Sequence, residues 1–144
     1  MKPTDIALSQ LLGIGAAPSG AAHLLEMPFG APVQNHLGTV HAAAQFALAE
    51  AASAECLLHH FGVAAGEVRA VVRHVEVKYR RPATGDLLAY GLPDDATRNG
   101  LLAELAARGR AQAVILIDLK DRAGTLMFHG KFVWFISRTP SPPA

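Results

Sequence analysis

The chain has little of several features that would indicate particular classes of protein. It contains a single cysteine, Cys56, so no disulfide can form within it, which is typical of a reducing compartment. Only 17% of its 144 residues are charged, and the net charge is +1, which gives no general attraction to nucleic acid. No apolar run is long enough to cross a membrane. We therefore expect a cytoplasmic protein that binds neither nucleic acid nor membranes.

The N-terminus carries one feature that points towards secretion instead. A lysine precedes a mildly apolar segment, residues 6–17, which faintly resembles a signal peptide. Polar residues interrupt this segment, and Thr4-Asp5 is typical of a helix N-cap. We therefore predict a short amphipathic helix over residues 4–12.

The pattern of apolar residues predicts one compact unit. Half of the residues, 51%, are hydrophobic, which is enough for one buried core in a chain of this length. Turn residues and apolar periodicity predict strands over residues 21–29, 67–80, 87–92, 111–120 and 125–137, and helices over residues 39–60 and 94–108. Short turns between strands favour an antiparallel sheet, which can wrap around an apolar helix. We therefore predict an α+β fold in a single domain, residues 1–137, followed by a Pro-rich tail, residues 138–144.

Glu50 is the most unusual residue of the helix predicted over residues 39–60. It is the only charge in an almost wholly apolar stretch, residues 41–54. A helix that is apolar on every face is normally buried, and a buried carboxylate is costly unless it is paired, hydrogen-bonded or protonated. Burial also raises a carboxyl pKa towards the range that suits a general base. Glu50 is therefore a candidate catalytic base; the alternative is a structural acid bonded to backbone at a subunit interface.

The residues around the start of this helix resemble a known family. Asn35 is followed by Gly38-Thr39-x-His41 and then by Glu50. This pattern is similar to that of the hotdog-fold thioesterases, and closest to the PaaI-like branch and related uncharacterised thioesterase-like families. Those proteins carry an Asn, then Gly-Thr-x-His-Gly-Gly, then an Asp or Glu on the central helix. Residues 77–86 resemble the strand-to-turn signature of the same family, so that the likeness extends over about residues 21–137.

The resemblance implies a fold and an activity. The fold is the hotdog, an antiparallel sheet wrapped around one long central helix, and the activity is hydrolysis of an acyl-CoA thioester at a dimer interface. Glu50 would act as general base or nucleophile, and a backbone N–H near Ala42, at the helix start, would stabilise the oxyanion. Asn35 and His41 would orient the water, the carbonyl or the loop; the alternatives are a turn-forming role for Asn35 and a helix-start contact for His41.

The implied substrate is a small molecule, and it brings its own coenzyme. Coenzyme A carries phosphates, for which Arg80 and Arg81 are the best candidate ligands; the alternative is that both are solvated surface charges. No further cofactor is expected. No metal site is expected either, because the histidines lack the spacing of metal ligands on one element.

The spacing between His41 and Glu50 bears on the oligomeric state. Nine residues on one helix are two and a half turns, so the two side chains point to opposite sides and lie roughly 13 Å apart along the axis. They cannot share a site within one chain, but they can share one across a two-fold axis. We therefore expect a homodimer; whether two dimers pair into a homotetramer is left open by the sequence.

Two departures from the family pattern leave a second function open. Ala42 and Ala43 stand where the family has glycines, and Val72 stands where many relatives carry Ser or Thr. These differences favour a non-catalytic acyl-CoA or lipid-binding protein as the alternative. A hotdog hydratase ranks lower, because hydratases carry a different helix-start motif.

Overall fold

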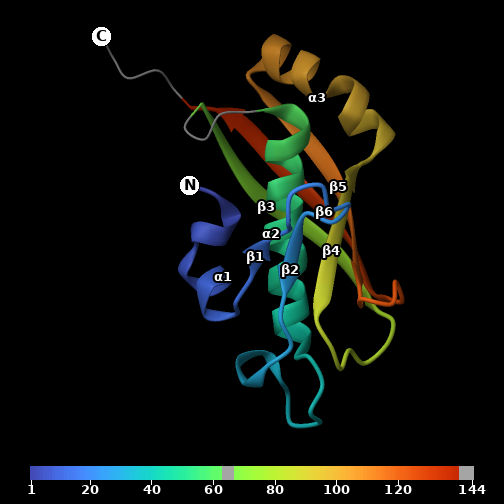
Figure 1. The fold of residues 1–144 in the computed structure, drawn as a ribbon. Coiled ribbons are helices and arrows are strands. Elements are labelled where there is room, and N and C mark those ends of the chain that lie inside the picture. Colours follow the sequence, from blue (N-terminus) through green and yellow to red (C-terminus); the bar gives the residue numbers. More distant parts are fainter. Residues whose placement is uncertain (63–66, 140–144) are drawn as a thin grey trace.

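The structure is a computed structural model that describes residues 1–62 and 67–139 (Figure 1). The elements are, in chain order, the 3-10 helix η1 (Pro3–Asp5), α1 (Ala7–Leu11), β1 (Gly15–Ala16), β2 (Leu25–Met27), the 3-10 helix η2 (Ala31–Val33), α2 (Ala42–Phe61), β3 (Val68–Tyr79), β4 (Leu87–Pro93), α3 (Asp95–Arg108), β5 (Arg110–Lys120) and β6 (Leu126–Arg138). The predicted α+β fold with one long helix is confirmed. No helix of the described residues is both long and apolar enough to cross a membrane.

The six strands of the described residues form one antiparallel sheet. Their order is β1-β2-β4-β5-β6-β3, so the long strand β3 lies at one edge. Among the described strands β3 pairs only with β6, and a register shift between Val72 and His74 marks a bulge in it. β5 alternates between buried and exposed residues, as expected for a strand with one face on the core. One edge of β3, along its twelve residues, therefore has no described partner strand.

Helix α2 is the centre of the fold. Figure 1 shows the sheet curling around it, with β2 crossing in front of the helix and β3 behind it. Its buried residues are mostly small, and Ala49, Ala52 and Ser53 are fully enclosed. His41 caps the N-terminus, and Gly62 ends the helix in the left-handed conformation with φ of 55°, which glycine adopts without strain.

The predicted helix over residues 39–60 begins three residues later in the structure. Thr39 and Val40 belong instead to an extended segment, because the Val40 N–H donates to the Ala83 carbonyl and Val40 forms a bridge with Gln34. The helix can start only after His41, whose extended backbone is typical of an N-cap.

Other boundaries also differ from the prediction. The single helix over residues 4–12 is wrong: Ile6 is extended, with ψ of 135°, and separates η1 from α1. The Thr4-Asp5 cap is wrong too, since Asp5 accepts from the Lys2 N–H at the start of η1. The strand over residues 21–29 shrinks to β2, which Pro28 follows directly. The predicted tail begins at a residue that is still in β6, Arg138; residues 140–144 lie outside the described residues.

Candidate functional site

Glu50 lies on the face of α2 that is turned towards the N-terminal segment and β3. Its side chain is half-buried, and among the described residues its carboxylate has no hydrogen-bond or ion-pair partner. It borders a hollow of about 370 Å³ lined by Pro3, Ile6, Leu8, Ser9, Ala47, Ala51, Ala54, Ala70, Val71, Val72 and Trp134. Burial among these mostly apolar groups raises the pKa of the Glu50 carboxyl. An unpartnered carboxylate of this kind is suited to accept a proton.

The backbone of Glu50 is fixed by a short chain of hydrogen bonds. Its carbonyl accepts a hydrogen bond of 2.7 Å from Ser53 Oγ, one turn further along the helix. Ser53 Oγ in turn accepts a bond of 3.0 Å from Nε1 of Trp134, on β6. Neither residue was predicted from the sequence as part of the site. Their signal is weak, because a serine and a tryptophan 81 positions apart reveal no contact until the sheet is folded around the helix.

His41 and Ala42 form the start of α2. The Nδ1 atom of His41 accepts from the Ala43 N–H over 3.0 Å, and the His41 carbonyl accepts from the N–H groups of Ala44 and Gln45. No acceptor among the described residues engages the Ala42 N–H. This group lies at the positive end of the helix, and is available to a ligand oxygen.

Asn35 shapes the loop that leads into α2. Its Oδ1 accepts from the N–H groups of Leu37, at 2.9 Å, and Thr39, at 3.1 Å. Its Nδ2 donates to the Thr39 hydroxyl over 2.9 Å. Gly38 follows in the left-handed conformation, with φ of 72°. The amide of Asn35 is therefore engaged in holding the turn, which is the alternative that the sequence left open.

Tyr79 connects the end of β3 to the helix start and was also missed as a site residue. Its hydroxyl donates to the Ala42 carbonyl over 3.2 Å, and its ring lies 5.2 Å from that of Phe128. Burial raises the pKa of the Tyr79 phenol, which therefore stays protonated at neutral pH. The signal for Tyr79 was its place directly before Arg80 in the strand-to-turn signature.

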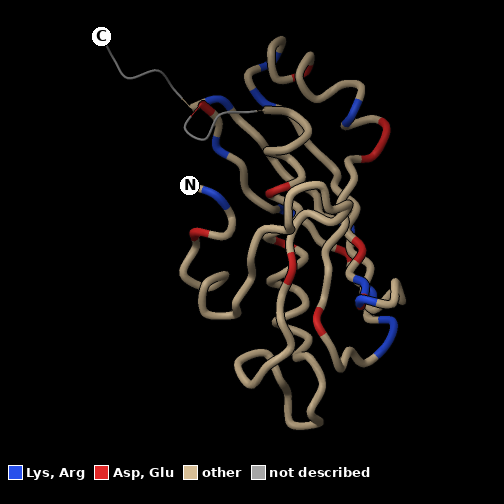
Figure 2. The backbone as a smooth tube through the Cα atoms, in the orientation of Figure 1, with Lys and Arg blue, Asp and Glu red and all other residues tan. Residues whose placement is uncertain are grey.

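Arg80 and Arg81 follow Tyr79 and are both exposed. The N–H groups of both donate to the Met127 carbonyl, which ties this turn to the first residues of β6. Figure 2 shows Lys and Arg positions of this turn and of the β5–β6 connection gathered at the same end of the molecule. The two arginines directly follow Tyr79, whose hydroxyl contacts the Ala42 carbonyl, but neither borders the hollow of Glu50.

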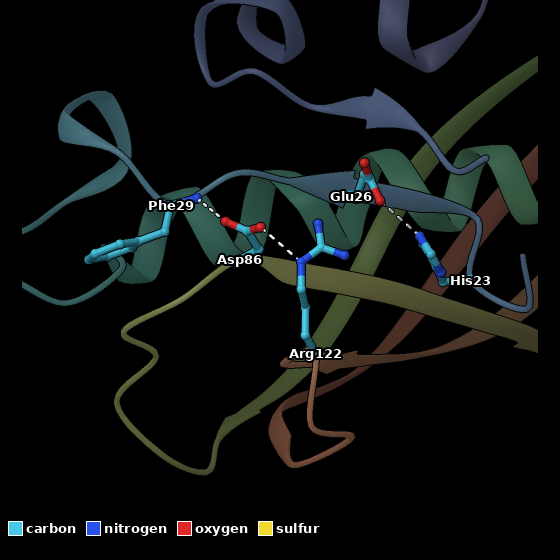
Figure 3. A network of polar contacts seen from close by, with 5 residues as sticks. All are labelled: His23, Glu26, Phe29, Asp86 and Arg122. Carbon is cyan, nitrogen blue, oxygen red and sulfur yellow. Dashed lines mark hydrogen bonds and ion pairs between the residues drawn. The ribbon is translucent and has the colours of Figure 1, made fainter.

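Asp86 anchors Phe29, which lies in the segment that precedes α2 (Figure 3). Its Oδ1 accepts from the Phe29 N–H over 2.8 Å, and its Oδ2 accepts from Arg122 Nε over 2.9 Å. The Phe29 N–H and the Arg122 guanidinium hold the pKa of the Asp86 carboxyl below its usual range. The last residue of the strand-to-turn signature therefore has a structural role that the sequence did not specify.

The structure does not bring the predicted residues together within one chain. His41 borders a separate hollow, of about 320 Å³, between α1 and the first turns of α2. This hollow and that of Glu50 have only Leu8 and Ala47 in common. Val72 does line the same hollow as Glu50, and it offers no hydroxyl there. No group of three or more His, Cys, Asp or Glu side chains within residues 1–62 and 67–139 is placed to hold a metal ion.

Solved structures of other proteins have a similar fold. The fold is similar to that of a protein of unknown function from Pseudomonas aeruginosa described as a probable thioesterase, with 26% identity, a TM-score of 0.79, and 94% of this chain and 89% of that chain covered. It is also similar to a thioesterase from Haemophilus influenzae, with 17% identity, a TM-score of 0.74, and 98% and 90% coverage. A third similar structure is a Bacillus halodurans protein crystallised with CoA, with 19% identity, a TM-score of 0.67, and 90% and 74% coverage.

These structures define the class: the chain has the hotdog fold of thioesterases, as the helix-start motif implied. Residues 19–136 match the model of one family, the domain of unknown function DUF4442, and the chain belongs to that family. No protein of curated function matches it.

Proposed function

We propose that this protein is an acyl-CoA thioesterase with Glu50 as its catalytic carboxylate. The observation that carries the proposal is the half-buried Glu50 carboxylate, which has no partner among the described residues and faces an apolar hollow on the central helix of a hotdog fold. Such an isolated carboxylate lowers the stability of the fold, so a role in chemistry accounts for its presence. The single cysteine, Cys56, is free and buried, which fits action in the cytoplasm.

The chemistry requires one base and one oxyanion donor. Glu50 takes a proton from water, the hydroxide oxygen attacks the thioester carbonyl carbon, and the Ala42 N–H stabilises the negative oxygen of the tetrahedral intermediate. The C–S bond then breaks, and the thiolate leaves with the proton that Glu50 returns. In the nucleophilic variant a Glu50 oxygen bonds to the acyl carbon and expels the thiolate, and water then hydrolyses the anhydride. A thiol of pKa ~8.5 leaves readily in either case.

The Ala42 and Glu50 of one site come from different subunits in this proposal. They lie eight residues apart on one helix, and the groups at the helix start do not border the hollow of Glu50. A two-fold axis brings the helix start of one subunit to the helix middle of its partner. The free edge of β3, which is long and exposes Val71 and Val77, is the surface suited to such pairing. We propose a homodimer, with a tetramer of two dimers as a further level of assembly.

The coenzyme A part of the substrate would lie at the helix start. Arg80 and Arg81 directly follow Tyr79, which contacts the helix start; both are exposed, and neither forms an ion pair with another described residue. Guanidinium groups bind phosphate through paired, charge-assisted hydrogen bonds. His41 and Asn35 support this region by capping the helix and holding the loop. The crystallised complex of the Bacillus halodurans protein with CoA supports a ligand of this chemistry.

A second function is favoured by a specific observation. Val72 borders the hollow of Glu50 without supplying a hydroxyl that would steady a water molecule. A protein that binds acyl-CoA or another lipid without hydrolysing it is consistent with that environment. The two functions predict different results: a thioesterase turns over acyl-CoA and needs Glu50 to do so, whereas a binding protein shows no turnover.

The test is thiol release from aryl, short-chain and long-chain acyl-CoA esters by the parent protein and by Glu50→Gln. We expect turnover in the parent and a fall in kcat of at least about 10²-fold in the variant, since the charge that accepts the proton is gone. Glu55→Gln, on the same helix, is the matched control and should retain the parent rate. If the folded parent binds acyl-CoA but releases no thiol from any ester, the protein is the binding module and not a thioesterase.

A further inference from the structure

The hollow beside Glu50 does not end at that residue. A second hollow, of about 220 Å³, continues along α2 towards its C-terminus. The two share five lining residues, which come from η1 and its flank, α2, β3 and β6: Pro3, Ile6, Ala54, Ala70 and Trp134. Because the shared residues lie on four separate segments, the two hollows form one groove. We call it the α2 groove.

The distal part of the α2 groove is almost entirely apolar. Beyond the shared residues it is lined by Met1, Lys2, Leu57, Leu58, Val68, Leu101 and Ile136, of which only Lys2 is charged. Hollows lined by apolar side chains bind apolar groups. The distal part of the groove is therefore suited to an apolar group and not to a charged one.

The N-terminal segment forms one wall of the groove. Residues 1–9 lie alongside α2, as Figure 1 shows, and Pro3 of this segment is buried. Ile6 lies where the two hollows meet, and it is extended, so that its side chain is placed between η1 and α1. It remains 47% exposed in this chain. A large apolar side chain that is half-exposed on the wall of an apolar groove is available for contact with a ligand.

The length of the groove indicates the size of that ligand. Glu50 and Leu58 lie eight residues apart on one helix, which corresponds to about 12 Å along its axis. An acetyl group would leave most of this length empty, whereas a long fatty acyl chain would extend beyond it. A straight acyl chain of medium length fills it.

We propose that the α2 groove receives the acyl chain of the substrate, with the thioester carbonyl at Glu50 and the tail running towards Leu58 and Leu101. The substrate class is then a medium-length aliphatic acyl thioester, and Ile6 and Ala54 are the residues that determine specificity. This inference rests on the proposed function for its reaction, though not for its binding site. Each methylene that enters the groove is expected to raise kcat/KM about threefold to fourfold.

The test compares kcat/KM for acetyl-, hexanoyl-, decanoyl- and palmitoyl-CoA. In the parent we expect kcat/KM to rise up to decanoyl-CoA and not beyond. Ala54→Leu places a larger side chain where the two hollows meet, and should lower the ratio of kcat/KM for decanoyl- over acetyl-CoA at least about tenfold. The same substitution at Ala103, an exposed position of α3, is the matched control and should leave the ratio unchanged. If chain length has no effect in the parent, or if Ala54→Leu leaves the ratio unchanged, the inference is wrong.

Two further measurements keep the test decisive. Ile6→Trp narrows the groove from a half-exposed position, and it replaces Ala54→Leu if that variant does not fold. Decanoic acid binding, measured by calorimetry, tests the groove without turnover. Binding by the parent that Ala54→Leu weakens, together with no thiol release from any ester, would overturn the thioesterase and support the acyl groove. Thiol release without any preference for medium chains, and without decanoic acid binding, would support the thioesterase and overturn the acyl groove.

Discussion

Nε1 of Trp134 donates a hydrogen bond of 3.0 Å to Oγ of Ser53, and this bond fixes a wall of the α2 groove to the helix that carries Glu50. Ser53 is fully buried and Trp134 is 6% exposed. Because Ser53 also donates to the Glu50 carbonyl, one hydroxyl serves both as acceptor and as donor. The Ser53 hydroxyl therefore couples the position of Glu50 on α2 to the position of the Trp134 indole.

Removal of this hydroxyl should be costly. In Ser53→Ala the indole N–H of Trp134 is left buried without a partner, so we expect a loss of about 1–3 kcal/mol in the free energy of unfolding. Denaturant unfolding measures this change. In a Trp134→Phe background there is no N–H to strand, and the same substitution should cost clearly less. Equal costs in both backgrounds would show that the hydrogen bond contributes nothing.

Glu50 should lower the stability of the fold at neutral pH. Burial raises its folded-state pKa above the unfolded value, so the folded chain binds the proton more tightly. The destabilisation is fully present above the folded-state pKa and disappears as pH falls through it towards the unfolded value. We therefore expect Glu50→Gln to have a higher Tm than the parent at pH 7, with the difference closing in acid. Thermal unfolding of the variant and the parent, from pH 7 into the acid range, measures this difference in Tm. A lower Tm for the variant at pH 7 would contradict the prediction.

The same raised pKa should limit catalysis in acid. A general base works only in its deprotonated form, so kcat/KM should fall as pH drops through the Glu50 pKa. We expect this acidic limb at a higher pH than that of an ordinary, solvated glutamate. A pH profile of thiol release measures it. A limb at the usual carboxylate pKa would mean that a different, exposed group controls the reaction.

The elements that sequence predicted best are those with a strong apolar period. α2 and the strands β3 to β6 lie within a few residues of their predicted positions, because their buried and exposed sides are set by local pattern. Glu50 was recognisable for a similar reason, as one charge in an apolar helix. The α+β class follows from these elements alone.

The parts that sequence did not predict depend on contacts between distant segments. The helix over residues 4–12 is interrupted at Ile6, whose extended backbone separates η1 from α1, and Ile6 lies on the wall of the α2 groove, which exists only after folding. The role of Asp86 depends on the Phe29 N–H, 57 residues away, and on Arg122, 36 residues away. A motif marks such positions without stating which partner each side chain binds.

Gly130 should not tolerate a side chain. A Cβ there would lie 2.7 Å from Cε2 of Phe132 and 2.9 Å from Cε1 of Phe128, and both rings are fully buried. We expect Gly130→Ala to lose about 1–3 kcal/mol in the free energy of unfolding through overpacking. Gly100→Ala is the matched control: it lies in α3 with open space around it and should gain about 0.5–1 kcal/mol. Denaturant unfolding of both variants tests the contrast, which a neutral Gly130→Ala would contradict.

Asp86 should stabilise the fold at neutral pH. Its folded-state pKa is lowered by the Phe29 N–H and by Arg122, so its contribution is present above the unfolded pKa and is lost as pH falls through the folded one. Asp86→Ala should cost about 1–2 kcal/mol at pH 7, and the difference from the parent should shrink below pH ~4. Asp86→Asn, which can still accept from Phe29, should cost less. Unfolding at both pH values measures this, and a cost that does not depend on pH would contradict it.

A site shared between two subunits makes a distinctive prediction. Ala42→Pro removes the oxyanion N–H, and it does so at the first position of a helix, where proline is well tolerated. Alone it should lower kcat about 10²–10³-fold, like the loss of other oxyanion donors. The Glu50→Gln variant alone should also be inactive.

Mixing the two inactive variants distinguishes a shared site from a site within one chain. In a heterodimer of Ala42→Pro with Glu50→Gln, one site combines the intact Glu50 of the first chain with the intact Ala42 of the second, and the other site carries both defects. Co-expression with different affinity tags isolates this heterodimer, and we expect up to about half of the parent activity, since one of two sites is intact. A site built within one chain would leave every site with one defect, so an inactive heterodimer would refute the shared site while leaving Glu50 as the base.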